Sequence, residues 1–144
     1  HVPHRRQRQM CIRDRPMRED ITILYVEDEE HIRDELIEIL ELDFDNILAA
    51  PNGEEGLDIY KKYHPDLVIS DIQMPKMDGL TMCKHIKELN GDAKVILTTA
   101  FAENSFVSRA KSMGIEHYVI KPINIDKLYK CINECLANKT DEKK

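Results

Sequence analysis

Five short runs of apolar residues recur along the chain and alternate with longer, more polar segments. The runs lie at 21–26, 47–50, 67–70, 95–99 and 118–120. Their apolar character is continuous rather than alternating, which is typical of strands covered on both faces. We therefore predict five buried β-strands.

The segments that follow most of these runs repeat apolar residues every three or four positions, the spacing of one helix face. The stripes are Ile32, Leu36, Ile39 and Leu40; Leu80, Cys83 and Ile86; Phe106, Ala110 and Met113; and Ile125, Leu128, Tyr129, Ile132 and Leu136. A further helix is expected near 54–63. A strand–helix unit repeated five times predicts an α/β fold, with a parallel sheet and helices on both faces.

The two ends of the chain do not fit this pattern. Residues 1–15, HVPHRRQRQMCIRDR, are strongly basic and have no apolar period. The run is similar to a translated sequencing adapter, so we interpret 1–19 as a non-native or disordered extension; a basic arm for nucleic acid or lipid is the alternative. Resequencing the source locus separates the two. We place the domain at 20–137 and expect 138–144 to be a charged tail or the start of a linker.

Setting aside the first 15 residues changes the charge of the domain. The whole chain has 21 Lys and Arg against 27 Asp and Glu; removing five arginines and one aspartate leaves 16 against 26, a net charge of −10. A domain this acidic is not expected to bind nucleic acid directly. No apolar run approaches the roughly 20 residues that cross a membrane. The cysteines form no CxxC pair, which favours a reducing cytoplasm.

Reactive residues follow four of the five predicted strands. Glu27 and Asp28 follow the first strand, Asp71 the third and Lys121 the fifth, while Thr99 ends the fourth. In open parallel sheets, ligands bind beyond the carboxyl ends of the strands. We therefore expect these side chains to converge on one edge of the sheet.

These residue types suit phosphoryl chemistry that depends on a metal ion. Three neighbouring carboxylates repel one another, and a hard divalent cation such as Mg²⁺ removes that cost. A lysine supplies a mobile positive charge for a phosphoryl oxygen. A carboxylate in such a site can act as a nucleophile and form an acyl phosphate.

Several motifs together resemble the receiver domains of bacterial two-component response regulators. They are Glu27-Asp28, the block DIQMPKMDG at 71–79, Thr99-Ala100, Tyr118 and Lys121-Pro122. The resemblance covers about residues 20–137. It implies a flavodoxin-like, doubly wound (βα)5 sheet with strand order 2-1-3-4-5. It also implies a cis peptide before Pro122, and Asp78 is a candidate N-cap for the third helix.

The resemblance assigns a role to each candidate residue. Asp71 takes a phosphoryl group from a sensor histidine kinase or a histidine phosphotransfer protein. Mg²⁺ is held by Asp28, Asp71 and the backbone carbonyl of Gln73, and through water by Glu27, where many members have Asp. The phosphoryl group is bound by Thr99, the Ala100 amide and Lys121, which with Asp71 form the catalytic set. Thr99 and Tyr118 form the switch, in which the aromatic ring turns inward.

The implied output is a change of shape, not turnover of a substrate. The fourth predicted helix, the fifth strand and the fifth helix would form the face that contacts a partner or a second copy. Phe101 lies beside the implied route of the hydrolytic water, so we expect a long-lived phosphoryl group. Two alternatives stay open. The first is an aspartate-nucleophile phosphatase, but such enzymes usually have a second Asp where Gln73 stands. The second is an unphosphorylated interaction module, but such a module would not need the complete set of site residues.

Overall fold

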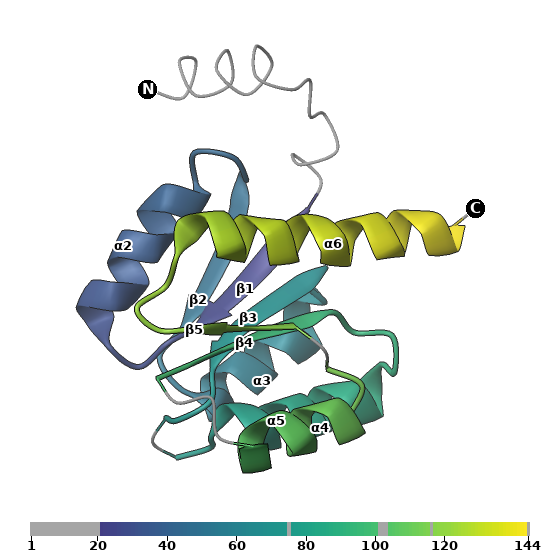
Figure 1. Cartoon of the computed structure of the whole chain (residues 1–144). Coiled ribbons are helices and arrows are strands. Elements are labelled where there is room, and N and C mark those ends of the chain that lie inside the picture. Colours follow the sequence, from purple (N-terminus) through teal and green to yellow (C-terminus); the bar gives the residue numbers. More distant parts are fainter. Residues whose placement is uncertain (1–20, 75, 101–103, 116, 144) are drawn as a thin grey trace.

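The chain folds into five parallel strands and five helices that alternate along the sequence (Figure 1). A computed structural model describes residues 21–74, 76–100, 104–115 and 117–143; the side chains of 104–107 and 137–143, and all of Phe101, lie outside this description. The strands are β1 (Thr22–Val26), β2 (Asn46–Ala50), β3 (Leu67–Asp71), β4 (Val95–Thr99) and β5 (His117–Ile120). The helices are α2 (Glu30–Leu40), α3 (Gly53–Tyr63), α4 (Gly79–Leu89), α5 (Asn104–Ser112) and α6 (Ile125–Lys143).

The sheet has the order β2-β1-β3-β4-β5, and every pairing is parallel. This confirms the predicted fold and strand order. Helices α2 and α6 cover one face, while α3, α4 and α5 cover the other (Figure 1). All residues of β3 and β4 are buried between these layers, as the continuous apolar runs predict. The edge strands β2 and β5 are partly exposed, so the prediction of five buried strands was wrong for these two.

Two apolar cores lie on opposite faces of the sheet. On one face, strand residues pack with Leu36 and Leu40 of α2 and with Leu128 and Ile132 of α6. On the other face, the core contains Leu57 and Tyr60 of α3, Leu80, Cys83 and Ile86 of α4, and Ala110 of α5. The buried positions of α2, α4, α5 and α6 belong to the helical stripes in the sequence, whereas no stripe had been predicted for Leu57 and Tyr60 of α3.

The last helix is longer than we expected. It continues to Lys143, so residues 138–143 extend α6. The sequence has no apolar residue after Ala137, which led us to expect a tail there. Helix hydrogen bonds are local, and Lys and Glu favour helices without any core contact, so an apolar stripe is not needed to continue one. Within the described part of the chain, no helix is both long enough and apolar enough to span a bilayer.

Candidate functional site

Asp71 is the last residue of β3, a central strand, so it lies at the carboxyl edge of the sheet. The residue is 6% exposed. The loop after it folds back closely, because the Gly79 amide donates a hydrogen bond to the Ile72 carbonyl at 2.8 Å. A Cβ at Gly79 would collide with the Asp71 carbonyl, which explains why glycine begins α4 here. The fold therefore holds Asp71 in a fixed, largely buried position.

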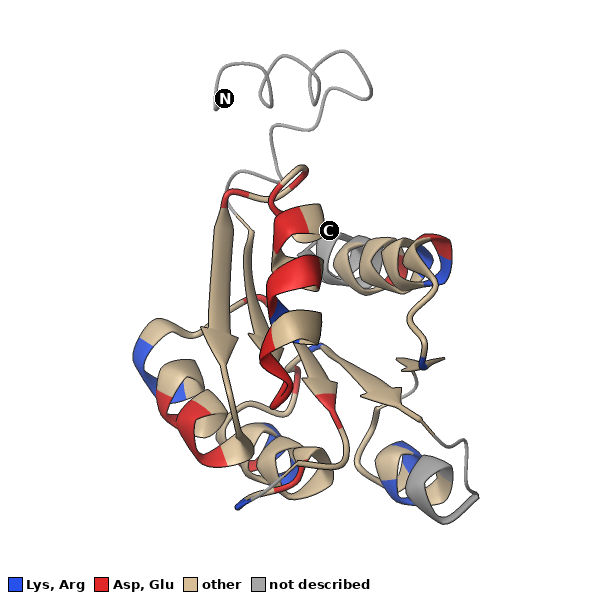
Figure 2. Cartoon of the chain, turned by 90° about the vertical axis from the view of Figure 1, so that its left-hand side faces the viewer, with Lys and Arg blue, Asp and Glu red and all other residues tan. Residues whose placement is uncertain are grey.

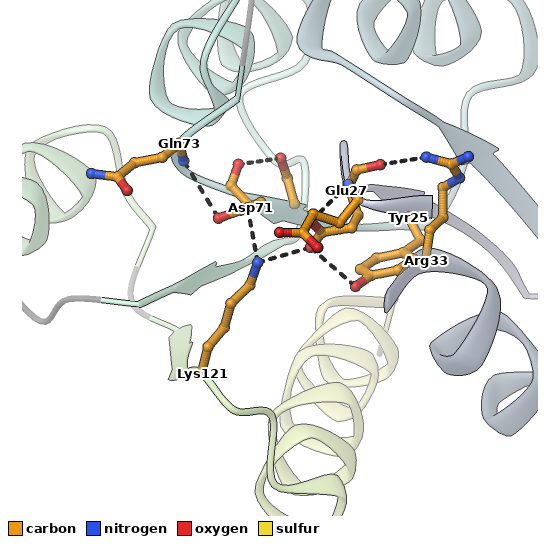
Figure 3. Close-up of polar contacts among 8 residues, drawn as sticks. Tyr25, Glu27, Arg33, Asp71, Gln73 and Lys121 are labelled. Atoms are coloured by element: carbon orange, nitrogen blue, oxygen red, sulfur yellow. Dashed lines mark hydrogen bonds and ion pairs between the residues drawn. The ribbon is translucent and has the colours of Figure 1, made fainter. Parts of the chain in front are cut away.

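Lys121 follows β5 and joins two of the predicted site carboxylates (Figure 3). Its Nζ atom donates to Asp71 Oδ2 at 2.9 Å and to Glu27 Oε1 at 3.0 Å. Its backbone N–H also donates to the Thr99 carbonyl at 2.7 Å. Burial alone would lower the pKa of Lys121, but the bonds and charges of Asp71 and Glu27 raise it above its usual value. Lys121 is therefore a firmly protonated cation at this edge, and its peptide bond to Pro122 is cis, as expected.

Glu27 lies fully buried immediately after β1. Its Oε1 atom accepts the bond from Lys121, and its Oε2 atom accepts from the Glu29 amide at 3.2 Å. Burial raises the pKa of this carboxyl and the charge of Asp71 raises it further, while Lys121 and the Glu29 amide act in the opposite direction. An additional positive charge nearby would stabilise the charged form of this buried carboxylate.

The three predicted carboxylates meet at one point. Glu27, Asp28 and Asp71 each present an oxygen, and these oxygens lie within 4.8 Å of one another. Glu27 and Asp71 are buried, whereas Asp28 is exposed at the rim. This set of oxygen donors, partly buried and partly open to solvent, fits a hard divalent cation that keeps some of its water ligands.

The remaining predicted residues take different positions at this edge or, for Tyr118, within β5. Thr99 ends β4 and is 2% exposed, and the adjacent Ala100 is exposed. The amide of Gln73 donates to Asp71 Oδ1 at 3.4 Å, while its side chain is exposed. Tyr118 lies on β5 with 43% of its surface exposed, so its ring is directed outward in this structure.

Two residues near Glu27 were missed by sequence reasoning. The Tyr25 hydroxyl lies 3.5 Å from Glu27 Oε1, and Arg33 Nη1 donates to the Glu27 carbonyl at 2.8 Å (Figure 3). Side chains two residues apart on a strand share a face, so the spacing of Tyr25 and Glu27 was a usable signal. The Arg33 contact needed the position of α2.

Acidic side chains also surround the site at longer range. Figure 2 shows acidic residues along the outward side of α2, the helix that follows Glu27 and Asp28. The exposed members are Glu30, Asp34, Glu35 and Glu38. Their summed field attracts cations to this edge and repels the phosphates of nucleic acids.

The comparisons with known proteins agree with this geometry. Residues 23–133 match the family model of the response regulator receiver domain. The chain is 36% identical to chemotaxis protein CheY of Bacillus subtilis over 115 residues, which make up 79% of this chain and 96% of that protein. It is 33% identical to sporulation initiation phosphotransferase F of the same organism over 119 residues, 83% of this chain and 96% of that protein.

A crystal structure of a response regulator receiver domain protein from Clostridium thermocellum has the same fold. The TM-score is 0.79 with 30% identity, and the match covers 83% of this chain and 97% of that one. The chain belongs to the response regulator receiver family. It is thus a receiver domain, homologous to phosphoacceptor domains of two-component signalling systems.

Proposed function

We propose that Asp71 is the phosphoacceptor of this receiver domain and that its phosphorylation switches the contacts of the chain. The observation that carries the proposal is the 2.9 Å contact between Asp71 and Lys121 beside two further carboxylates. A buried carboxylate with a protonated lysine at its oxygen has both a nucleophile and a counter-charge for an incoming phosphoryl group.

The transfer step follows from these groups. An Asp71 carboxylate oxygen attacks the phosphorus of a phosphohistidine on a donor protein, the P–N bond breaks, and an acyl phosphate forms. The bonding electron pair stays with the donor imidazole, which then takes up a proton. Lys121 compensates the negative charge of the phosphoryl oxygens, and Thr99 and the Ala100 amide bind those oxygens.

Glu27, Asp28, Asp71 and the Gln73 carbonyl would hold Mg²⁺ at this edge. The all-oxygen donor set and the raised pKa of Glu27 support a hard cation there. When bound, Mg²⁺ supplies charge neutralisation for the transferring phosphoryl group. Asp71 supplies the nucleophile, and Lys121 orients the phosphoryl group that Asp71 receives.

The donor is a sensor histidine kinase or a histidine phosphotransfer protein, and it needs a surface beside Asp71. An apolar cavity of about 610 Å³ adjoins Lys121 between α2 and the segment after β5; its apolar lining includes Ile32, Leu36, Ile39, Ile123 and Ile125. The outward side of α2 is acidic (Figure 2). A donor helix with apolar side chains flanked by basic residues would complement both features.

The free cysteines Cys83, Cys131 and Cys135 suit a reducing cytoplasm.

The output lies on the face formed by α5, β5 and α6. Tyr118 and Ile120 of β5 are 43% and 47% exposed, so this face carries apolar side chains available for a partner or a second copy. Movement of Thr99 toward the phosphoryl group would make room for the Tyr118 ring to turn inward. The face would then change shape when Asp71 is phosphorylated.

Incubation with Mg²⁺ and acetyl phosphate tests the proposal. We expect mass spectrometry to detect one phosphoryl group on the chain, Asp71→Asn to abolish it, and Asp92→Asn at an exposed loop position to leave it unchanged. Rapid multiple turnover on phosphate esters would instead indicate a phosphatase. A wild-type chain that gains no mass would indicate an interaction module and would refute the proposal.

A further inference from the structure

Tyr25 is a fully buried tyrosine beneath the carboxylate cluster. It lies on β1 two residues before Glu27, and its ring packs in the core covered by α2 and α6. A buried phenol needs a hydrogen-bond acceptor. Its hydroxyl lies 3.5 Å from Glu27 Oε1 and is directed at it from below (Figure 3). Tyr25 therefore contacts the one site carboxylate that is completely buried.

Glu27 needs this support because of its length. Relative to an aspartate at the same position, it has an additional methylene group and one more rotatable bond, so its carboxylate has more positions to adopt. Several contacts restrict it. Its Oε1 atom accepts from Lys121 and Tyr25, and its Oε2 atom accepts from the Glu29 amide. Its backbone carbonyl accepts from Arg33 at 2.8 Å.

The phenol is also the right kind of donor for this place. A second cation bonded to the Glu27 carboxylate would repel a metal ion bound by the three carboxylates. Arg33 contacts only the backbone carbonyl of Glu27. A neutral hydroxyl restricts the Glu27 carboxylate without adding positive charge. Lys121 already supplies the one cation that the phosphoryl group needs.

We propose that Tyr25 is a positioning residue, whose hydroxyl holds the Glu27 carboxylate in the cluster with Asp28 and Asp71. The inference rests on the proposed Mg²⁺-dependent phosphorylation of Asp71. Tyr25 touches neither the metal nor the phosphoryl group and acts only through Glu27. It adapts the site to a glutamate at this position.

Tyr25→Phe in the full chain tests the role, because it removes the hydroxyl and keeps the ring. We expect calorimetric titration with MgCl₂ to give a dissociation constant about three- to tenfold higher, the effect of losing one long hydrogen bond to a charged group. Phosphorylation by acetyl phosphate should slow at low Mg²⁺ and recover at saturating Mg²⁺. Equal slowing at all Mg²⁺ concentrations would refute the positioning role.

A double-mutant cycle shows whether Tyr25 acts through Glu27. The shorter side chain of Glu27→Asp draws the carboxylate away from the phenol, so Tyr25→Phe should have no further effect on Mg²⁺ affinity in that background. An equal loss in both backgrounds would mean that packing, and not the hydroxyl contact, is responsible.

Tyr60→Phe is the matched control. Tyr60 is also buried, and its hydroxyl accepts a bond from Asn90 at 3.2 Å on the other face of the sheet. Its substitution should leave Mg²⁺ affinity unchanged; a loss as large as that of Tyr25→Phe would overturn the inference. If the wild-type chain itself bound no Mg²⁺, the proposed function would fail; if only Tyr25→Phe had no effect, the inference alone would fail.

Discussion

Two neighbouring threonines at the end of β4 have different environments. Thr99 belongs to the candidate site, whereas Thr98 is completely buried. Within the described residues, the Thr98 hydroxyl is a buried polar group that has no hydrogen-bond partner. Such a group costs free energy because it gives up its bonds to water on folding.

Replacing Thr98 with valine should therefore stabilise the domain. The two side chains have nearly the same shape, and removing the unsatisfied hydroxyl should raise the free energy of unfolding by about 1 kcal/mol. Urea denaturation measures the change. Thr99→Val is the control and should give no such gain. A less stable Thr98→Val variant would show that the hydroxyl has a partner in solution.

Phe101 carries a prediction about the lifetime of the phosphoryl group. The family resemblance implies that this residue, which lies outside the described structure, stands beside the route of the hydrolytic water, where a bulky apolar side chain would hinder that water. Phe101→Glu should accelerate loss of phosphate from the phosphorylated chain by about tenfold, less than a full general base contributes, because a carboxylate there could accept a hydrogen bond from the hydrolytic water. Release of inorganic phosphate measures the rate. An unchanged or slower rate would contradict the prediction.

At the scale of elements, capping residues begin two helices near the site. Asn52 caps α3, where its side chain accepts from the Glu55 amide at 2.9 Å. Asp78 caps α4 by accepting from the Thr81 amide at 2.8 Å, which confirms the N-cap inferred from the sequence. Since α4 begins where the loop after Asp71 ends, its cap also fixes one end of that loop.

Loss of the α4 cap should cost stability. Asp78→Ala leaves the Thr81 amide without its acceptor and should lower the free energy of unfolding by about 1 kcal/mol. Asp78→Ser keeps a capping oxygen and should stay within a few tenths of a kcal/mol of the wild type. Thermal or urea unfolding compares the variants. An equal loss in both would show that the charge of Asp78, and not its capping bond, stabilises the helix.

For the whole molecule, the buried carboxylates of the site lower the stability of the fold, and a bound cation would offset this effect. Burial raises the pKa of Glu27 above its ordinary value of 4.5, so the folded chain holds this proton more tightly than the unfolded chain. Its contribution to stability is therefore largest at low pH and declines as the pH rises from the ordinary pKa to the raised one. Near neutral pH, the buried charge destabilises the metal-free fold.

Glu27→Gln should reverse this effect. The amide oxygen can still accept from Lys121, while the buried charge is gone. Near neutral pH without Mg²⁺, we expect Tm to rise by about 3–5 °C, the shift that roughly 1 kcal/mol produces in a domain of this size. Added Mg²⁺ should raise the Tm of the wild type more than that of the variant. A lower Tm without Mg²⁺, or equal responses to Mg²⁺, would contradict the prediction.

The sequence was sufficient for the fold class and for the charged groups that lie together at the candidate site. Continuous apolar runs identified all five strands, because the central strands β1, β3 and β4 are buried on both faces, although the edge strands β2 and β5 are partly exposed. Strand ends then identified Asp71, Glu27 and Lys121, because in a parallel sheet all carboxyl ends meet at one edge. Local hydrogen bonding sufficed for the Asp78 cap.

How these groups meet could be seen only in the folded chain. Lys121 reaches Glu27 across 94 residues and Asp71 across 50, and neither contact follows from local spacing. The Tyr25 and Glu27 contact was missed, because spacing shows only that two side chains share a strand face, and burial between the sheet and two helices brings them together. Residue types and periodicity are local properties, whereas distances between strand ends depend on register and on the helices that cover them.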